Sequence, residues 1–340
     1  MGFLPVSKAD MDILGWEAVD FVLVTGDAYV DHPSFGCAII ARVLENNGYK
    51  VAVLSQPGWK GPEDFRRFGR PRLGFMITAG CVDSMVNNYS VSKRRRKRDV
   101  YSPGGEAGRR PDRAVIVYSN RAKQAYKDAP VILGGLEASL RRLGHYDYWD
   151  NKVRRSILLD SKADILIYGM GERAALEVAA ALNEGFPARD ISWVRGTVFR
   201  SREAPQGAMA LPRFEALGDK AAYAESFRHQ YENTDSVSAS ALVEEYAEGL
   251  CVVQNPPQPP LTQAEMDSVY ELPYMGVPHP GCVGEGGIPA AEEISFSLTA
   301  CRGCFGGCAF CALTAHQGRV VTGRSKGSLL REAEKLTERP

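Results

Sequence analysis

Short apolar runs alternate with helical patterns through roughly the first 185 residues of the chain. Six of these runs have the length and composition of buried strands, at residues 21–24, 51–54, 73–77, 114–118, 131–133 and 165–168. Strands that alternate with helices are typical of a parallel sheet covered on both faces. The pattern therefore predicts an α/β fold, a Rossmann-like doubly wound parallel sheet, over residues 1–195.

The hydrophobic pattern weakens over residues 196–288, which we expect to form an irregular linker or insertion. A proline cluster at residues 255–260 favours polyproline geometry and indicates a boundary. Thr262 and Glu265 then have the spacing of a capping box, which predicts the beginning of a short helix.

A second domain is expected to begin near residue 289. Residues 294–298 alternate between apolar and polar side chains, as a half-buried strand does. Residues 328–336 have the pattern of an amphipathic helix. We therefore expect residues 289–340 to contain one strand followed by at least one helix.

Composition narrows the class of protein. The chain has 41 Lys and Arg residues against 41 Asp and Glu, and zero net charge argues against a protein held to nucleic acid or membrane by its overall field. No apolar run approaches the roughly 18 residues that a membrane span needs. The N-terminal residues lack the apolar stretch and cleavage site of a signal peptide, so we expect a cytoplasmic protein with no membrane partner.

Four of the eight cysteines lie close together, at Cys301, Cys304, Cys308 and Cys311. Without a secretory signal, such a cluster indicates a metal or cofactor site rather than disulfides. Zinc sites usually separate two C-x2-C pairs by a dozen or more residues, and the bacterial ferredoxin spacing is also different. The spacing therefore differs from that of bacterial ferredoxins and disfavours a zinc site, and structural zinc is kept as the main alternative to an Fe-S cluster.

The last three cysteines, Cys304, Cys308 and Cys311, form a C-x3-C-x2-C motif with Phe310 before the final cysteine. This motif resembles the signature of the radical S-adenosylmethionine (SAM) enzymes. The resemblance implies that the three thiolates hold a [4Fe-4S] cluster whose fourth iron binds SAM, with Phe310 near the adenine. It implies a 5′-deoxyadenosyl radical acting on an unknown substrate. Cys301 lies outside the motif and is not expected to be a ligand.

Longer segments resemble one family within that superfamily. Residues 24–36, 134–142, 145–150, 265–269 and 301–319 are similar to the YgiQ-type radical SAM family, whose members are uncharacterised. The resemblance implies a Rossmann-like domain followed by a radical SAM domain.

The length of the chain differs from that family. Family members are roughly twice as long, and a complete (β/α) barrel needs more residues than follow the motif. We therefore expect the first βα unit of a truncated barrel, in a gene fragment or in one half of a split protein whose second chain carries the rest. Such a chain alone is not expected to hold SAM well. The alternative is a non-catalytic Fe-S or zinc-binding module.

The N-terminal sheet also resembles cobalamin-binding domains, through Gly134 and Gly135 after one strand and residues 168–172 after another. The cobalamin motif D-x-H-x-x-G is absent, because Asp31 is directly followed by His32. The favoured interpretation is a domain of cobalamin-binding-like architecture that shapes a substrate cleft.

Polar residues at the end of the first predicted strand allow two interpretations. Asp27, Asp31 and His32 lie where doubly wound folds bind ligands, so they form either a substrate pocket or a capped structural loop. Residues 145–150, with Trp149, either stack on a planar substrate or close one end of the sheet.

A run of six cations occupies residues 93–98, followed by Arg109, Arg110 and Arg113. Such a patch binds RNA phosphates in some proteins, but a run of like charges is more often a solvated loop. RNA therefore enters as a possible partner, and the solvated loop is the favoured interpretation.

Overall fold

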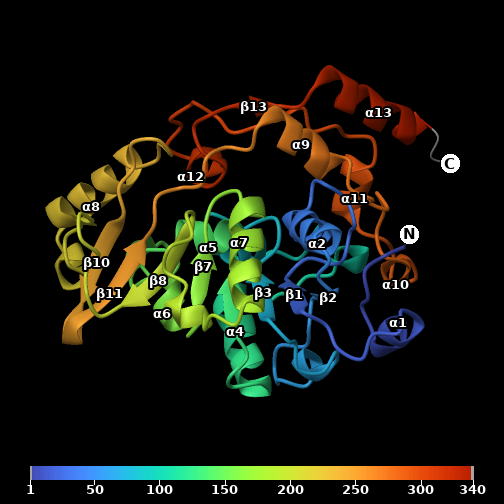
Figure 1. Cartoon of the computed structure of the whole chain (residues 1–340), viewed down its shortest axis with the longest axis horizontal. Coiled ribbons are helices and arrows are strands. Elements are labelled where there is room, and N and C mark those ends of the chain that lie inside the picture. The colour runs from blue at the N-terminus through green and yellow to red at the C-terminus, as the bar shows by residue number, and fades with distance from the viewer. Residues whose placement is uncertain (1, 338–340) are drawn as a thin grey trace.

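The structure is a computed structural model that describes residues 2–337. Within these residues, one nine-stranded sheet crosses the molecule (Figure 1). Its strands, in spatial order, are β2 (Val51–Ser55), β1 (Phe21–Thr25), β3 (Gly74–Thr78), β4 (Val131–Leu133), β7 (Ile165–Ile167), β8 (Thr197–Ser201), β11 (Leu250–Gln254), β10 (Leu242–Tyr246) and β9 (Met209–Ala210). The first five strands are parallel, and all five were predicted from the sequence.

Helices cover both faces of the parallel strands, as predicted. Because alternate residues of a strand point to opposite faces, Leu23 of β1 packs with one set of helices and Val24 with the other. The first face is covered by α2 (Gly36–Asn46) and α7 (Glu172–Asn183), and the second by α4 (Ala114–Ala125) and α6 (Ile157–Asp160). The α/β fold is therefore doubly wound, with a mostly parallel sheet.

The strand predicted at residues 114–118 is wrong, because this run begins helix α4. Val115, Tyr118 and Ala122 are spaced three and four residues apart and are fully buried against the sheet. A short apolar run fits a buried strand and a buried helical turn equally well, so its pattern does not distinguish them.

Residues 196–288 were expected to form an irregular linker or insertion, but residues 197–254 of this segment extend the main sheet. Strand β8 pairs antiparallel with β7, and β11 and β10 continue antiparallel beyond it. Helix α8 (Lys220–Glu232) lies beside these strands at the far end of the sheet (Figure 1). The sheet therefore continues past the domain boundary predicted at residue 195, and that domain division stays a prediction.

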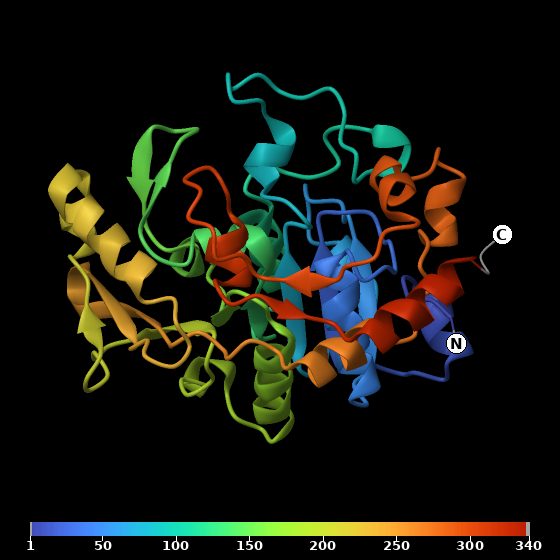
Figure 2. The ribbon, with the colours of Figure 1, turned by 90° about the horizontal axis from the view of Figure 1, so that it is seen from above.

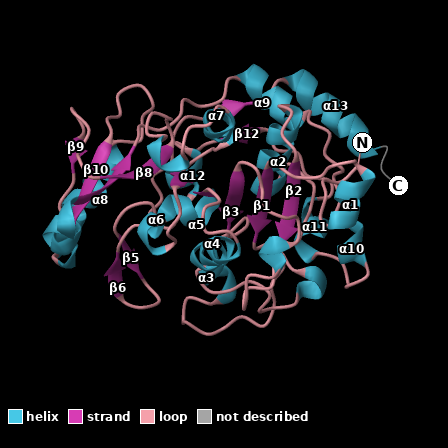
Figure 3. Cartoon of the chain, turned by 60° about the horizontal axis from the view of Figure 1, so that its bottom comes forward, coloured by secondary structure: helices cyan, strands magenta, loops and turns pink. Residues whose placement is uncertain are grey.

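Several shorter elements surround the main sheet. Strands β5 (His145–Asp147) and β6 (Lys152–Arg154) form a separate antiparallel hairpin, seen apart from the main sheet in Figure 3. The short helices are α1 (Lys8–Ile13), α3 (Ser84–Asn88) and α5 (Gly135–Leu140). Helix α5 directly follows β4 and lies at the carboxyl end of the parallel strands.

The C-terminal part of the chain crosses over the carboxyl ends of the parallel strands (Figure 2). Its elements are α9 (Gln263–Tyr270), α10 (Pro280–Val283), α11 (Pro289–Ile294), β12 (Cys301–Arg302), α12 (Leu313–Gln317), β13 (Thr322–Gly323) and α13 (Lys326–Thr337). The predicted capping box of α9 is confirmed, with Thr262 and Glu265 bonded reciprocally. The helix predicted at 328–336 is confirmed within α13.

The strand predicted at residues 294–298 is wrong. Ile294 ends helix α11, and Phe296 is 73% exposed in the loop that follows. An alternating pattern specifies a strand only where one face is covered, and here the apolar side chain remains in solvent. The strand before the three motif cysteines is instead the two-residue β12, which contains Cys301 and pairs antiparallel with β13.

In the part of the chain that the structure describes, no helix combines the length and the apolar character that a bilayer crossing requires.

Candidate functional site

The three motif cysteines lie on one loop between β12 and α12. The backbone N–H of Cys304 donates to the carbonyl of Gly318 at 3.0 Å, which closes the base of the loop. The hydroxyl of Thr314 donates to the carbonyl of Gly306 at 2.7 Å. Within the loop, the N–H of Cys311 donates to the carbonyl of Cys308 at 3.0 Å. The loop thus has a defined backbone held from its downstream helix.

Two glycines of this loop occupy positions that a side chain would disturb. Gly303 has a φ of +88°, and a Cβ there would lie 2.0 Å from the carbonyl oxygen of Val320. A Cβ at Gly306 would lie 3.3 Å from the Sγ of Cys304 and 3.9 Å from the Sγ of Cys308. Gly306 therefore leaves open a space beside two of the three thiols.

All eight cysteines are free thiols, so a disulfide framework is not present. Cys304 and Cys311 are half-buried, whereas Cys301 and Cys308 are exposed. The side chain of Phe310 is 92% exposed. Among the described residues, no group of three or more His, Cys, Asp or Glu side chains stands in a metal-binding arrangement. The donor chemistry and the space at Gly306 suit a metal cluster, and the ligand set stays a prediction.

The loop is anchored to the sheet on its upstream side by a buried ion pair. The Nη1 of Arg302 in β12 bonds the Oε1 of Glu172 at the start of α7. The Nε of Arg302 donates to the hydroxyl of Tyr270 at 2.9 Å, and its guanidinium lies 4.9 Å from that ring centroid. The sequence motif gave no indication of this contact, because Glu172 and Arg302 are far apart in the chain.

The downstream side of the loop is anchored through His316 of α12. Its Nδ1 lies 3.0 Å from the Oγ of Ser139 in α5. Burial against the sheet edge disfavours the charged imidazolium and lowers the pKa of His316 to about 4, although Glu172 acts in the opposite direction. At neutral pH this histidine is therefore uncharged.

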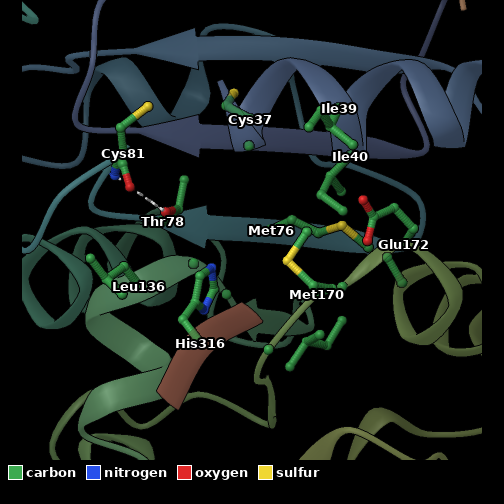
Figure 4. Close-up of a pocket in the computed structure, with 18 of the residues that line it drawn as sticks. Cys37, Ile39, Ile40, Met76, Thr78, Cys81, Leu136, Met170, Glu172 and His316 are labelled. Carbon is green, nitrogen blue, oxygen red and sulfur yellow. Dashed lines mark hydrogen bonds between the residues drawn. The ribbon is translucent and has the colours of Figure 1, made fainter. Parts of the chain in front are cut away.

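A cavity of about 360 Å³ lies between these anchors and the carboxyl ends of the parallel strands (Figure 4). In doubly wound folds this edge is where ligands bind. The walls come from β3, β4 and β7, from the start of α2, and from the C-terminal segment, which contributes Thr299, Arg302, His316 and Gln317. The cysteine-bearing segment thus forms one wall of the cavity, although Cys304, Cys308 and Cys311 themselves lie outside its lining.

Asp27 and Asp31 have structural partners. Asp27 Oδ1 lies 2.7 Å from a guanidinium nitrogen of Arg110, and its Oδ2 accepts from the N–H of Cys81 at 2.7 Å. Asp31 pairs with the buried Arg42 and accepts from the N–H of Met275 at 3.1 Å. Both carboxylates are buried. Of the two interpretations given above, the structural loop is the one these contacts support.

His32 lies in the same buried loop as these carboxylates. Its Nδ1 accepts from the N–H of Ser34 at 3.1 Å, a contact within the loop that caps the turn before α2. The contact supports the structural interpretation for this residue as well.

The basic run and the aromatic segment at 145–150 lie against each other, which the sequence did not indicate. The Nζ of Lys93 lies 4.7 Å from the ring centroid of Tyr148 and donates to the carbonyl of Trp149 at 3.1 Å. Residues 93–98 are all exposed. Arg109, Arg110 and Arg113 do not join this patch as free cations, because each is paired with carboxylates.

The family comparison adds to this geometry. Residues 3–297 match the family model described as Radical SAM N-terminal, so the chain belongs to the Radical SAM N-terminal family. The chain is 54% identical, over 340 residues, to a UPF0313 protein of Clostridium botulinum (strain 657 / Type Ba4), covering 99% of this chain and 53% of that protein. It is also 54% identical to a UPF0313 protein of Clostridium perfringens (strain 13 / Type A), covering 99% and 51%. These relatives confirm the predicted YgiQ-type membership.

The chain spans about half the length of these curated relatives. Among solved structures, it is similar to the radical SAM methyltransferase TsrM from Kitasatospora setae, in a structure with tryptophan substrate and a SAM analog bound. That likeness has a TM-score of 0.49 and 17% sequence identity, and covers 93% of this chain and 45% of TsrM. A second TsrM structure, with cobalamin and a [4Fe-4S] cluster, gives a TM-score of 0.47 and 16% identity over 94% of this chain and 46% of TsrM.

Proposed function

We propose that this chain carries the cluster-binding loop of a radical SAM enzyme, with Cys304, Cys308 and Cys311 as the ligands of a [4Fe-4S] cluster and SAM as the exchangeable partner. The observation that carries the proposal is a C-x3-C-x2-C motif of free thiols on a glycine-containing loop, in a chain of the Radical SAM N-terminal family. When bound, such a cluster supplies the electron that cleaves SAM into methionine and a 5′-deoxyadenosyl radical.

Residues around the cysteine loop have separate roles in this proposal. Gly306 keeps the space beside two thiols free of a side chain, and Thr314 fixes the carbonyl of the same residue. Three thiolates leave one iron of a four-iron cluster open for SAM, and an open coordination position is what a catalytic metal site needs. The exposed ring of Phe310 then offers an apolar surface for the adenine of SAM.

The complete reaction belongs to the longer protein in this proposal. Because the chain spans about half of its relatives, the remaining barrel strands and most SAM contacts are assigned to the other half, on the same or a second polypeptide. Residues 289–337 would then supply the first barrel unit. We expect residues 1–340 alone to bind the cluster without cleaving SAM appreciably, and the substrate is not assigned.

Anaerobic reconstitution with iron and sulfide tests the proposal. The expected result is about four irons per chain with thiolate-to-iron charge-transfer absorbance. Cys308→Ala is expected to lose the absorbance, while Cys301→Ala, a matched change in the neighbouring strand, keeps it. One tightly bound zinc without absorbance overturns the proposal in favour of a structural metal site.

A second candidate function is single-stranded RNA binding by a basic-aromatic patch, defined as residues 93–98 with Tyr148. None of the six cations forms an ion pair with a carboxylate of the described residues. Tyr148 is 45% exposed, and its ring lies next to the positive charge of Lys93. Cations that follow a phosphate backbone and exposed rings that stack on bases are the two elements of single-strand recognition.

Fluorescence anisotropy with a labelled single-stranded oligoribonucleotide tests this candidate. The variant Arg94→Glu/Lys97→Glu is expected to weaken binding and to flatten its dependence on salt, since fewer counterions are released. Tyr148→Ala is expected to weaken binding with an unchanged salt slope. The control is Arg66→Glu/Arg70→Glu, the same charge change at exposed positions elsewhere. Equal loss in patch and control variants overturns the candidate.

A further inference from the structure

Two buried polar atoms of the cavity wall lack a hydrogen-bond partner among the described residues. They are the Oε2 of Glu172 and the Nη2 of Arg302, the atoms of these two side chains that the ion pair anchoring the loop leaves unused. The two residues are only 4% and 7% exposed, and both line the cavity. A buried polar atom without a partner costs about 1–3 kcal/mol, so the site presents an unused acceptor and an unused donor.

The charges at this end of the cavity cancel. The carboxylate of Glu172 is balanced by the guanidinium of Arg302, and the low pKa of His316 leaves that ring neutral. A charged ligand would therefore gain no counter-charge in exchange for its lost hydration. The electrostatics favour an uncharged ligand.

The remaining walls are mostly apolar. Figure 4 shows Ile39, Ile40, Met76, Leu136 and Met170 around the space, with the Glu172 carboxylate at one end. Glycines at the strand ends add walls without side chains, at Gly134, Gly135, Gly169 and Gly171. Apolar side walls with a few convergent polar atoms suit a flat ring system held by one polar edge.

We propose that this cavity binds an uncharged planar nitrogen heterocycle whose edge carries a hydrogen-bond donor beside an acceptor, as the amino edge of adenine does. The exocyclic amino group donates to Glu172 Oε2, and the adjacent ring nitrogen accepts from Arg302 Nη2. The rings lie between the apolar walls. The cavity volume of about 360 Å³ is within the range of small-molecule sites.

The alternatives fit the same atoms less well. A carboxylate or phosphate satisfies Arg302 but leaves Glu172 without a donor and places two anions together. A hydrocarbon ring leaves both polar atoms unpaired. An indole has a donor and no acceptor beside it, so it satisfies only Glu172. The complementary pair of orphan atoms thus selects for the amino-heterocycle edge.

The inference is independent of the cluster, because none of the three loop cysteines lines the cavity, and neither does Cys301. The test therefore uses the full 340-residue chain with Cys308→Ala, in which the proposed cluster site is disabled. Isothermal titration calorimetry with adenine is compared with N6,N6-dimethyladenine, which has lost the donor, and with indole. Adenine is expected to bind, and each analogue at least about tenfold more weakly, the loss that one hydrogen bond to a charged group produces.

Protein variants locate the binding. Glu172→Gln keeps an amide oxygen for Arg302 but loses the anionic acceptor, and is expected to weaken adenine binding about tenfold. Glu177→Gln is the matched control, since it lies exposed on the same helix. Gly134→Leu is expected to abolish binding by filling the cavity, because a Cβ there meets only the carbonyl oxygen of Ile167, at 4.0 Å. Circular dichroism confirms that each variant is folded.

Three outcomes overturn the inference. The first is no adenine binding up to millimolar concentration, which would indicate water on the two polar atoms. The second is equal affinity for adenine and its dimethyl analogue, or binding that survives Gly134→Leu. The third is that adenine does not bind while hydroxocobalamin binds, and that Gly134→Leu prevents the binding of hydroxocobalamin. This result would assign the cavity to a corrinoid instead.

Discussion

Glu172 and Arg302, 130 residues apart in the chain, form a buried ion pair that ties the cysteine-bearing segment to the carboxyl edge of the parallel sheet. One partner begins helix α7, the first helix after strand β7, and the other directly precedes the loop. The position of the loop is therefore determined by the sheet as well as by its own backbone.

Removing one partner of this pair is predicted to destabilise the fold strongly. Arg302→Met leaves the Glu172 carboxylate buried and uncompensated, and the expected loss is about 3–5 kcal/mol of unfolding free energy. Chemical denaturation measures it. The control is Arg331→Met, whose ion pair with Glu271 is exposed and is expected to contribute under about 1 kcal/mol. Equal losses in both variants would contradict the prediction.

Filling the space beside the thiols is predicted to impair metal binding while leaving the fold intact. The Cβ of Gly306→Ala lies 3.3 Å from Cys304 Sγ, so that thiol must move before it can ligate. Iron content after anaerobic reconstitution is expected to fall, with an unchanged melting temperature. Gly218→Ala, where a Cβ meets nothing within 4 Å, is the control and is expected to retain the iron. Full iron loading of Gly306→Ala would refute the role given to this glycine.

Gly303 and Gly318 lie at the base of the loop, and comparing them separates two reasons for needing glycine: a positive φ, and a lack of room for a Cβ. Both have positive φ, +88° and +87°, but only a Cβ at Gly303 would meet backbone, at 2.0 Å from the Val320 carbonyl oxygen. Strain at a positive φ costs about 1–3 kcal/mol, so both alanine variants are expected to lose stability. Gly303→Ala is expected to lose more and to expose residues 303–312 to hydrogen exchange. A larger effect at Gly318 would argue against the close contact.

His316 is predicted to make stability depend on pH between about 6.5 and 4. Its pKa falls from 6.5 when unfolded to about 4 in the fold, so the unfolded chain binds more protons in this window and stability decreases as the pH falls. Because the ring is only half-buried, we expect a contribution of about 1–2 kcal/mol. Denaturation at pH 7 and pH 5 measures the difference, which His316→Gln should reduce. An unchanged difference in the variant would assign the pH dependence to other groups.

The core strands were predictable because their apolar runs are continuous and bounded by turns. Strands such as β1 and β2 are buried on both faces, so every residue of the run carries the signal. The run at 114–118 was misassigned for the same reason, since a buried helical turn is equally apolar. The alternation at 294–298 was misleading because an alternating pattern is compatible with a half-buried strand but does not indicate whether a second strand is present to pair with it.

The candidate site was only partly predictable. The spacing of Cys304, Cys308 and Cys311 is local, so the sequence displays it directly. The cavity is not local, because its walls come from strand ends, helix starts and the C-terminal segment. The residues around Glu172 and those around Arg302 contain no pattern that indicates their pairing. The burial of Asp27 depends on its ion pair with Arg110, which the sequence analysis placed in a surface patch.

The wall shared by the cavity and the cysteine loop has a thermodynamic consequence. Arg302 and His316 hold the two ends of the loop and also line the cavity. A molecule that hydrogen-bonds to Arg302 therefore changes the contacts that hold the loop, and with them the arrangement of the three thiols. Any such effect is reciprocal by linkage: a cavity ligand that tightens metal binding is itself bound more tightly by the metal-loaded protein, by the same factor. The affinity of the cavity for its ligand therefore reports whether the cysteine loop holds a metal.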